Sequence, residues 1–251
     1  NKASQLRTQV SNRRTAGSGL FNGMIYPIKD YAVKGILWYQ GESNAGNPQS
    51  YERLLELIIS DWRKWYSNAQ MPFLLVQLPN FMQVREQPTD SGWARIRDAQ
   101  FKISKRIPNT FLAVTYDTGE WNDIHPLNKK DIAKRLILGA RKIIYNEKLV
   151  FSGPIYQSYK IVNDKVELSF ETNGSKLKAK DGQQLQHFAI AGEDKKFMWA
   201  QAEIKGNRIL VSHPDIKQPK AVRYAWADNP EAANLINQEG LLASPFRTDD
   251  W

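Results

Sequence analysis

A regular alternation of short apolar runs with longer amphipathic segments, from about residue 30 to residue 147, constrains the fold of this 251-residue chain most strongly. The apolar runs have the length of buried strands, and they cover residues 34–39, 73–78 and 110–116. The segments that follow them repeat apolar residues every three or four positions, which predicts helices at 51–66, 91–105 and 131–145. Strands and helices that alternate in this way are typical of βαβ units around a parallel sheet.

The pattern changes after Gly153-Pro154 to short alternating segments separated by turn residues. Three pairs occupy positions where hairpin turns are expected, namely Asn163-Asp164, Asn173-Gly174 and Gly206-Asn207. We therefore predict two units. Residues 1–150 form an α/β domain with a parallel sheet, and residues 151–251 form a β-rich, sandwich-like accessory domain.

Composition limits the kinds of site that the chain can carry. It contains no cysteine, and its three histidines, His125, His187 and His213, are not at metal-ligand spacing, so we expect no metal. The net charge of +9 raises the question of nucleic acid, but the basic residues are scattered among acidic ones, and we expect no nucleic-acid partner. No apolar run approaches the roughly 18 residues of a membrane span.

Polar residues follow each predicted strand, where open parallel sheets bind their ligands. The three loops are Gln40–Asn44 (QGESN), Pro79–Phe81, and Asp117–Pro126 (DTGEWNDIHP). Because the carboxyl ends of parallel strands share one edge of the sheet, we expect the QGESN and DIHP segments to lie at the same end.

His125 is the candidate general base in the third of these loops. A neutral histidine oriented by a carboxylate, here Asp123, accepts a proton from a hydroxyl near neutral pH in acyl-transfer chemistry. A structural role, in which His125 caps the helix expected after Pro126, is the alternative that the residues leave open.

The QGESN loop offers an amide donor and a serine. The side chain of Gln40 is suited to stabilising a developing oxyanion. Ser43 lies in a G-x-S sequence that lacks the second glycine of G-x-S-x-G, so we predict that it is not a nucleophile. The alternative is a turn in which Gly41, Ser43 and Asn44 satisfy backbone groups ahead of the next helix.

Three blocks taken together resemble sialate O-acetylesterases of the SGNH hydrolase superfamily. They are WYQGESN at 38–44, DIHPLNK at 123–129, and the ending from RYAWADNP at 223–230 to SPFRTD at 244–249. The resemblance runs from about Gly19 to the last residue. It implies a flavodoxin-like, three-layer α/β domain with β-sandwich additions, and a cofactor-free serine esterase that removes acetyl groups from hydroxyls of sialic acid or related sugars. It also suggests a secreted, periplasmic or lysosomal protein.

The resemblance further implies roles for individual residues. His125 takes the position of the catalytic base, and the oxyanion and substrate-binding block comprises Gln40, Gly41, Glu42, Ser43 and Asn44. Asp123 is our choice for the acid, although the superfamily's usual DxxH spacing falls on Asn122. A histidine-only dyad and a histidine oriented by the backbone remain alternatives.

The family's nucleophilic serine lies in a GQSN motif upstream of QGES, and these 251 residues contain no GQSN. We therefore expect an α/β domain that is incomplete at its N-terminus, with the missing segment supplied by the same or another polypeptide. The first residue is Asn, which we interpret as a processed or truncated start. Two alternatives stay open: a deacetylase of xylan or another polysaccharide, and an inactive carbohydrate-binding pseudo-esterase.

Overall fold

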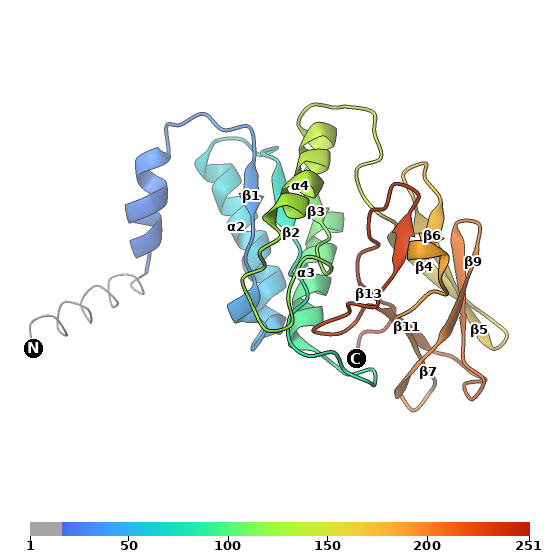
Figure 1. The fold of residues 1–251 in the computed structure, drawn as a ribbon. Coiled ribbons are helices and arrows are strands. Elements are labelled where there is room, and N and C mark those ends of the chain that lie inside the picture. The colour runs from blue at the N-terminus through green and yellow to red at the C-terminus, as the bar shows by residue number, and fades with distance from the viewer. Residues whose placement is uncertain (1–16) are drawn as a thin grey trace, which may run out of the picture.

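A small parallel sheet forms the centre of the first half of the chain in the computed structural model, which describes residues 17–251 (Figure 1). Its strands are β1 (Ile36–Trp38), β2 (Phe73–Val76) and β3 (Thr110–Ala113), in the order β1-β2-β3. They alternate with helices α2 (Tyr51–Trp65), α3 (Gly92–Arg106) and α4 (Lys129–Ile143). The six predicted elements are confirmed, although each strand is shorter than its apolar run.

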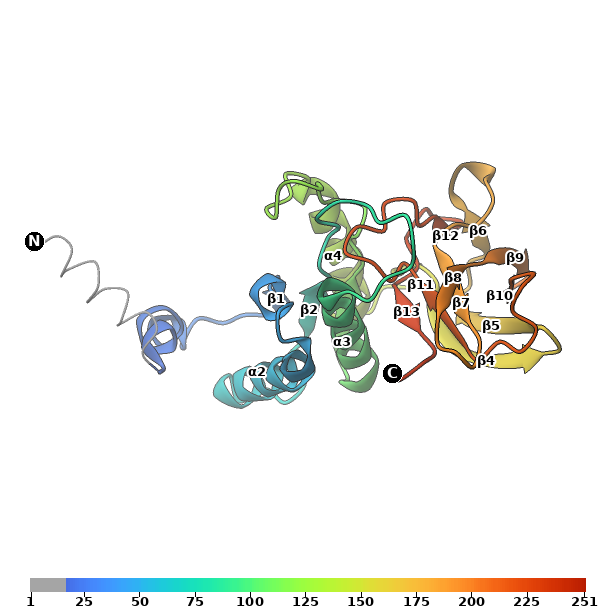
Figure 2. The ribbon, with the colours of Figure 1, turned by 90° about the horizontal axis from the view of Figure 1, so that it is seen from below.

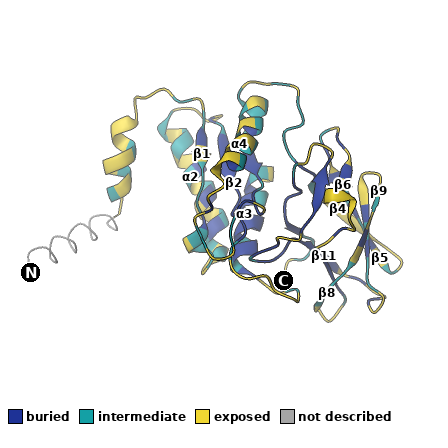
Figure 3. Ribbon diagram, in the orientation of Figure 1, coloured by how far each residue is buried: buried dark blue, intermediate teal, exposed yellow. Residues whose placement is uncertain are grey.

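Helices cover both faces of this sheet, as Figure 2 shows. Residues such as Leu55 of α2 and Ile96 of α3 pack with Phe73 and Leu75 in one apolar cluster. On the opposite face, Leu74, Phe111 and Ala113 pack against the apolar side of α4, which includes Leu136 and Ala140. All four residues of β2 are buried, because this strand is central and both of its faces are covered (Figure 3).

Polar side chains fix the starts of two helices. The Ser91 hydroxyl accepts a hydrogen bond from the Ala94 N–H at 2.9 Å, which confirms the predicted N-cap of α3. Helix α4 is capped by Asn128, whose Oδ1 accepts from the Asp131 N–H at 3.2 Å. His125 therefore does not cap this helix, and that structural alternative is wrong.

The regular elements of the second half of the chain are strands and one short 3₁₀ turn (Lys180–Gly182), which confirms the prediction that this half is rich in strands. Two four-stranded antiparallel sheets have the orders β4-β5-β10-β9 and β13-β11-β7-β8, and β6 pairs with β12. The strands are β4 (Ile155–Val162), β5 (Lys165–Glu171), β6 (Leu177–Ala179), β7 (Phe188–Ala191), β8 (Phe197–Trp199), β9 (Gln201–Lys205), β10 (Arg208–Ser212), β11 (Ala221–Tyr224), β12 (Leu235–Asn237) and β13 (Phe246–Arg247). Their inward side chains share one core, in which Leu168 and Ile209 meet Phe188 and Tyr224.

Two of the three predicted hairpin turns are confirmed. Asn163 joins β4 to β5 and Gly206 joins β9 to β10, each with a positive φ that suits a tight turn. The prediction for Asn173-Gly174 is wrong. Both residues form a turn with positive φ, but the following strand β6 leaves the sheet and pairs with β12.

Arg97 of α3 is fully buried and joins the two halves of the chain. Its Nε donates to the Leu78 carbonyl at 2.7 Å, and its Nη2 donates to the Pro79 carbonyl at 2.6 Å. From the other half it binds the carbonyls of Ala227 at 2.7 Å and Asp228 at 3.0 Å. Burial lowers the pKa of Arg97 to about 9, which still leaves the guanidinium protonated at neutral pH. One side chain thus fastens the loop after β2 to the loop after β11.

Replacement of this side chain tests how far the two halves depend on it. We expect Arg97→Met to lower the free energy of unfolding by at least about 3 kcal/mol, because the buried carbonyls lose their donors. Urea denaturation measures the change. Arg53→Met, at an exposed arginine paired with Glu56, is the matched control and should cost less than about 1 kcal/mol. Equal losses in the two variants would contradict the role given to Arg97.

Candidate active site

Backbone contacts to the neighbouring helices fix the QGESN loop after β1. The Gln40 carbonyl accepts hydrogen bonds from Tyr51 Oη at 2.8 Å and from Gln100 Nε2 at 3.2 Å. Gly41 follows with a φ of 151°, a conformation that favours glycine. A Cβ there would lie 3.0 Å from Ile96 Cγ2 and 3.2 Å from Tyr51 Oη. The glycine is therefore required both by the backbone conformation and by the tight packing.

The amide side chains of this loop face each other. Gln40 Nε2 donates to Asn44 Oδ1 at 2.8 Å, which uses one of its two N–H groups and leaves the other for a ligand. Glu42–Asn44 form one 3₁₀ turn, with the Ser43 side chain exposed to solvent. Gln40 and Asn44 line a cavity of about 630 Å³. Its other walls are Trp38, Tyr51, and residues of α2 that are mostly apolar but include Ser60 and Asp61.

The DIHP segment presents His125 to solvent, with 89% of its side chain exposed. Its Nδ1 lies 3.8 Å from Asp123 Oδ1, beyond hydrogen-bond distance. The same carboxylate oxygen accepts the backbone N–H of His125 at 2.8 Å and so shapes the turn. Ile124, between them, packs on the apolar cluster beneath α2 and α3 and holds the segment at the sheet edge.

Asn80, in the loop after β2, connects the other loops of this edge and is only 6% exposed. Its Oδ1 accepts the N–H of Gly119, from the loop after β3, at 2.7 Å. Its Nδ2 donates to Asn229 Oδ1, from the β-rich half, at 3.1 Å. The sequence predicts a strand-end loop at 79–81 without indicating a role for Asn80. The signal that could have identified Asn80 is a polar residue four positions after a fully apolar strand.

A cation–aromatic contact brings the segment after DIHP to the QGESN loop. The Nζ of Lys129 lies 4.8 Å from the centre of the Tyr39 ring, and Tyr39 directly precedes Gln40. Burial, followed by the charge of Glu42, raises the pKa of Tyr39 to about 12, so the phenol stays protonated. The loops after β1 and β3 therefore share one edge, although His125 and Asp123 do not line the cavity beside Gln40.

Two further titratable side chains, Asp117 and His213, have local partners. Asp117 forms a bidentate ion pair with Arg135 of α4, and His213 Nδ1 accepts the N–H of Asp215 at 3.1 Å. Residues 17–251 contain no cluster of three or more histidine, aspartate or glutamate side chains placed to hold a metal ion. Among the same residues, no helix has the length and apolar character needed to cross a membrane.

Comparison with known proteins gives a consistent result. A family model described as "Carbohydrate esterase, sialic acid-specific acetylesterase" matches residues 8–134. The chain is 31% identical to the sialate O-acetylesterase of Mus musculus, over 92% of this chain and 47% of the relative. It is 35% identical to that of Homo sapiens over 59% of this chain and 31% of the relative.

A solved structure is similar over nearly the whole chain. It is a carbohydrate acetylesterase from Xanthomonas citri, 41% identical in sequence, with a TM-score of 0.87. The match covers 91% of this chain and 53% of that one. The chain thus spans about half the length of the relatives that it matches.

The geometry around the QGESN loop predicts different effects at Gly41, within the loop, and at Gly46, two residues after it. We expect Gly41→Ala to lower the free energy of unfolding by about 1–3 kcal/mol, through backbone strain and the contact with Ile96. Gly46→Ala is the matched control, because an added Cβ there meets nothing within 4 Å, and its effect should stay within about 0.5 kcal/mol. Chemical denaturation compares the two, and similar small losses would refute the packing argument.

Proposed function

The chain belongs to the carbohydrate esterase family of sialic acid-specific acetylesterases, and on this basis we propose that it provides the base and the oxyanion donor of a sugar O-acetylesterase. The observation that carries the proposal is the family match over residues 8–134, which includes both the QGESN and DIHP segments. In this proposal the parallel sheet with its helices, within residues 1–150, is part of a three-layer SGNH hydrolase domain. Residues 151–251 are its accessory unit.

His125 is the general base in the proposed site. Its exposure leaves the imidazole open to a hydroxyl group, and Asp123 lies close enough to orient it after a small side-chain rotation. Asp123 is the acid of the proposal, with a backbone-oriented histidine as the second possibility. Gln40 supplies the oxyanion donor with its second amide N–H, while Asn44 holds the amide in place at 2.8 Å.

The proposed reaction follows the serine esterase sequence. A serine Oγ attacks the acetyl carbonyl carbon while His125 accepts the hydroxyl proton. The tetrahedral oxyanion receives the hydrogen bond of Gln40, a contribution of about 2.7 to 4 kcal/mol for donors of this kind. The sugar hydroxyl then leaves with the proton from His125, and water, activated by the same base, hydrolyses the acetyl-enzyme.

The attacking serine of this proposal lies outside the 251 residues. They contain no GQSN sequence, and Ser43 lacks the sequence context of a nucleophile elbow. Uncovered apolar surface at β1, one of the two outer strands of the described sheet, supports a further segment packing there. Leu37 is 65% exposed, and Leu54 and Leu57 of α2 are also exposed.

Two substrate classes have support. Similarity to the sialate O-acetylesterases of mouse and human supports acetylated sialic acid as the substrate. The Xanthomonas citri protein, 41% identical, is described more broadly as a carbohydrate acetylesterase, and an acetylated carbohydrate other than sialic acid, such as xylan, is the second candidate. An inactive, sugar-binding protein is the third possibility, and measurement of acetate release separates it from both.

The role of His125 is tested in a protein that carries these residues together with the segment preceding them. We expect His125→Ala to reduce acetate release from O-acetylated sialic acid and from 4-nitrophenyl acetate at least about 1,000-fold, because members of a catalytic unit fail together. His213→Gln, at a histidine used in a turn of the β-rich half, is the control for general damage. Retention of activity in His125→Ala would refute the proposal.

Covalent labelling tests the placement of the serine. A fluorophosphonate probe should leave the 251-residue chain unlabelled and should label the longer protein, because the probe reports an activated serine. In the longer protein, labelling should persist in Ser43→Ala. Mass spectrometry locates the label, and a label on Ser43 would overturn this part of the proposal.

A further inference from the structure

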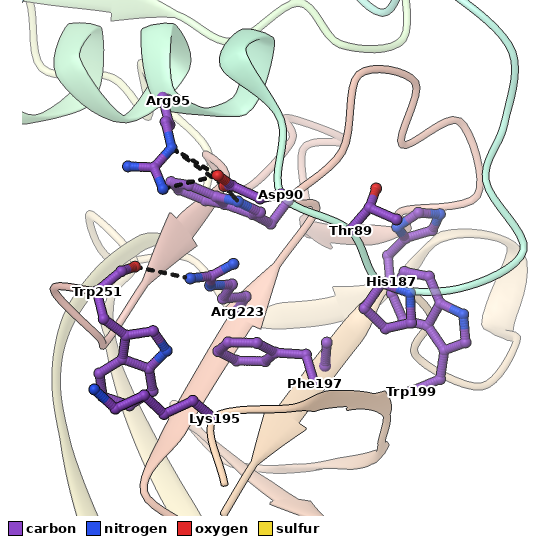
Figure 4. Close-up of a pocket in the computed structure, with 12 residues that line it drawn as sticks. Thr89, Asp90, Arg95, His187, Lys195, Phe197, Trp199, Arg223 and Trp251 are labelled. Atoms are coloured by element: carbon purple, nitrogen blue, oxygen red, sulfur yellow. Dashed lines mark hydrogen bonds and ion pairs between the residues drawn. The ribbon is translucent and has the colours of Figure 1, made fainter. Parts of the chain in front are cut away.

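A second cleft, of about 330 Å³, lies between the loop that precedes α3 and the sheet β13-β11-β7-β8 (Figure 4). Its walls combine aromatic and cationic side chains, chiefly Arg95, Lys195, Phe197, Trp199, Arg223 and Trp251. None of them lines the cavity beside Gln40. The volume is within the range of sites that bind small molecules, and junctions between structural units commonly hold such sites.

Indole groups fasten the two walls of the cleft to each other. Trp199 of β8 donates from Nε1 to the Glu86 carbonyl at 2.7 Å. Trp226, after β11, donates from Nε1 to Asp90 Oδ1 at 3.3 Å. Both acceptors belong to the loop that connects β2 to α3, so segments more than 100 residues apart in sequence build one cleft. Such fastening fixes the ring positions before a ligand enters, which lowers the entropic cost of binding.

Hydrogen-bond donors remain unused at the cleft. Arg223 binds Asp249 through Nε at 2.9 Å and Nη2 at 2.6 Å, and its Nη1 donates to no residue between 17 and 251. Arg95 likewise binds Asp90 through Nε and Nη2, and within the described chain its Nη1 has no acceptor. Each arginine therefore keeps two N–H donors for another oxygen.

The third cation forms no close ion pair with the described residues 17–251. Lys195 Nζ lies 4.9 Å from the centre of the Trp251 ring. The pKa of Glu193 is lowered mainly by Lys220, and the charge of Lys195 adds only a smaller part to this lowering. Asp90 pairs with Arg95, and Asp249 is shared between Arg223 and Arg247, so cations outnumber acids around the cleft. His187 also lines the cleft; burial lowers its pKa to about 4, so it stays neutral at physiological pH.

We propose that this cleft binds a sugar residue that carries a carboxylate. The indole of Trp199 offers an apolar face to a pyranose ring, whereas Phe197 packs against the Arg223 guanidinium, 4.1 Å from its ring centre. The free guanidinium and ammonium N–H groups match hydroxyl and carboxylate oxygens. The excess of cations suits an anionic group, and the aromatic wall favours a carboxylate carried on a sugar ring over free phosphate. Because the loop from β2 to α3 forms one wall, a glycan held here is anchored beside the candidate active site.

Binding to sugars without acetyl esters tests this site independently of the proposed esterase. Ligand-observed NMR titration of the chain with the methyl glycoside of N-acetylneuraminic acid, methyl glucuronoside, methyl glucoside and inorganic phosphate compares the ligand classes. We expect the two acidic sugars to bind with a dissociation constant of about 1 mM, and the neutral sugar and phosphate to bind at least about tenfold more weakly.

Paired variants locate the binding. Lys195→Gln should weaken binding of the acidic sugars about threefold, since it removes an exposed charge. Lys196→Gln, at the adjacent lysine outside the cleft, should leave binding unchanged. Trp199→Leu should weaken binding at least about tenfold through loss of the aromatic wall. Thermal unfolding checks that each variant is folded. If Trp199→Leu is unfolded, the comparison of Lys195→Gln with Lys196→Gln alone tests the proposal.

Several results would overturn the proposal. They are the absence of binding by acidic sugars at about 10 mM, ten times the expected dissociation constant, equal affinity for methyl glucoside or phosphate, and equal effects of the two lysine variants. The esterase assay reads acetate release and depends on His125, whereas this assay reads binding of sugars without acetyl esters and depends on Lys195 and Trp199. Failure of one proposal is therefore distinguishable from failure of the other.

Discussion

The guanidinium of Arg97 is the contact on which the arrangement of this molecule most depends. It donates to carbonyls on both sides of the junction, from the loop after β2 and from the segment after β11. Burying a cation costs free energy unless its N–H groups find acceptors. Here the acceptors are backbone carbonyls from two loops that form no strand pairing with each other. Arg97 thus links helix α3, the sheet edge with the candidate site, and the β-rich half. Because Arg97 binds the carbonyls of Leu78 and Pro79, it also fixes the loop after β2 at the candidate site.

The helices and strands could be predicted from sequence because their signals are local. Apolar spacing in 51–66 and the serine at 91 specify helix and cap within a few residues of chain. The error at Asn173-Gly174 has a different origin: the turn itself is local, but the partner of the strand that follows it is more than 50 residues away. Arg97 and Asn80 were not singled out for the same reason, since their partners at Ala227 and Asn229 lie well over 100 residues along the chain.

The segments that form the candidate site could be predicted from the sequence, but the distances between their side chains could not. QGESN and DIHP could be assigned to one edge because they follow parallel strands, and the Lys129 contact with Tyr39 agrees with that. The 3.8 Å separation of His125 and Asp123 depends on side-chain torsions in an exposed turn, which no spacing in the sequence encodes. The pairing of Gln40 with Asn44 is a further detail of this kind, set by a 3₁₀ turn that only the folded loop reveals.

The free side of β1 has a consequence for handling the chain as a reagent. Within the described residues β1 pairs only with β2, so its outer backbone N–H and C=O groups face away from the sheet beside the exposed Leu37. An unpaired, apolar edge is a template for intermolecular strand addition. At high concentration this edge favours self-association and precipitation, and a Lys at position 37 is the simplest substitution for keeping preparations monodisperse.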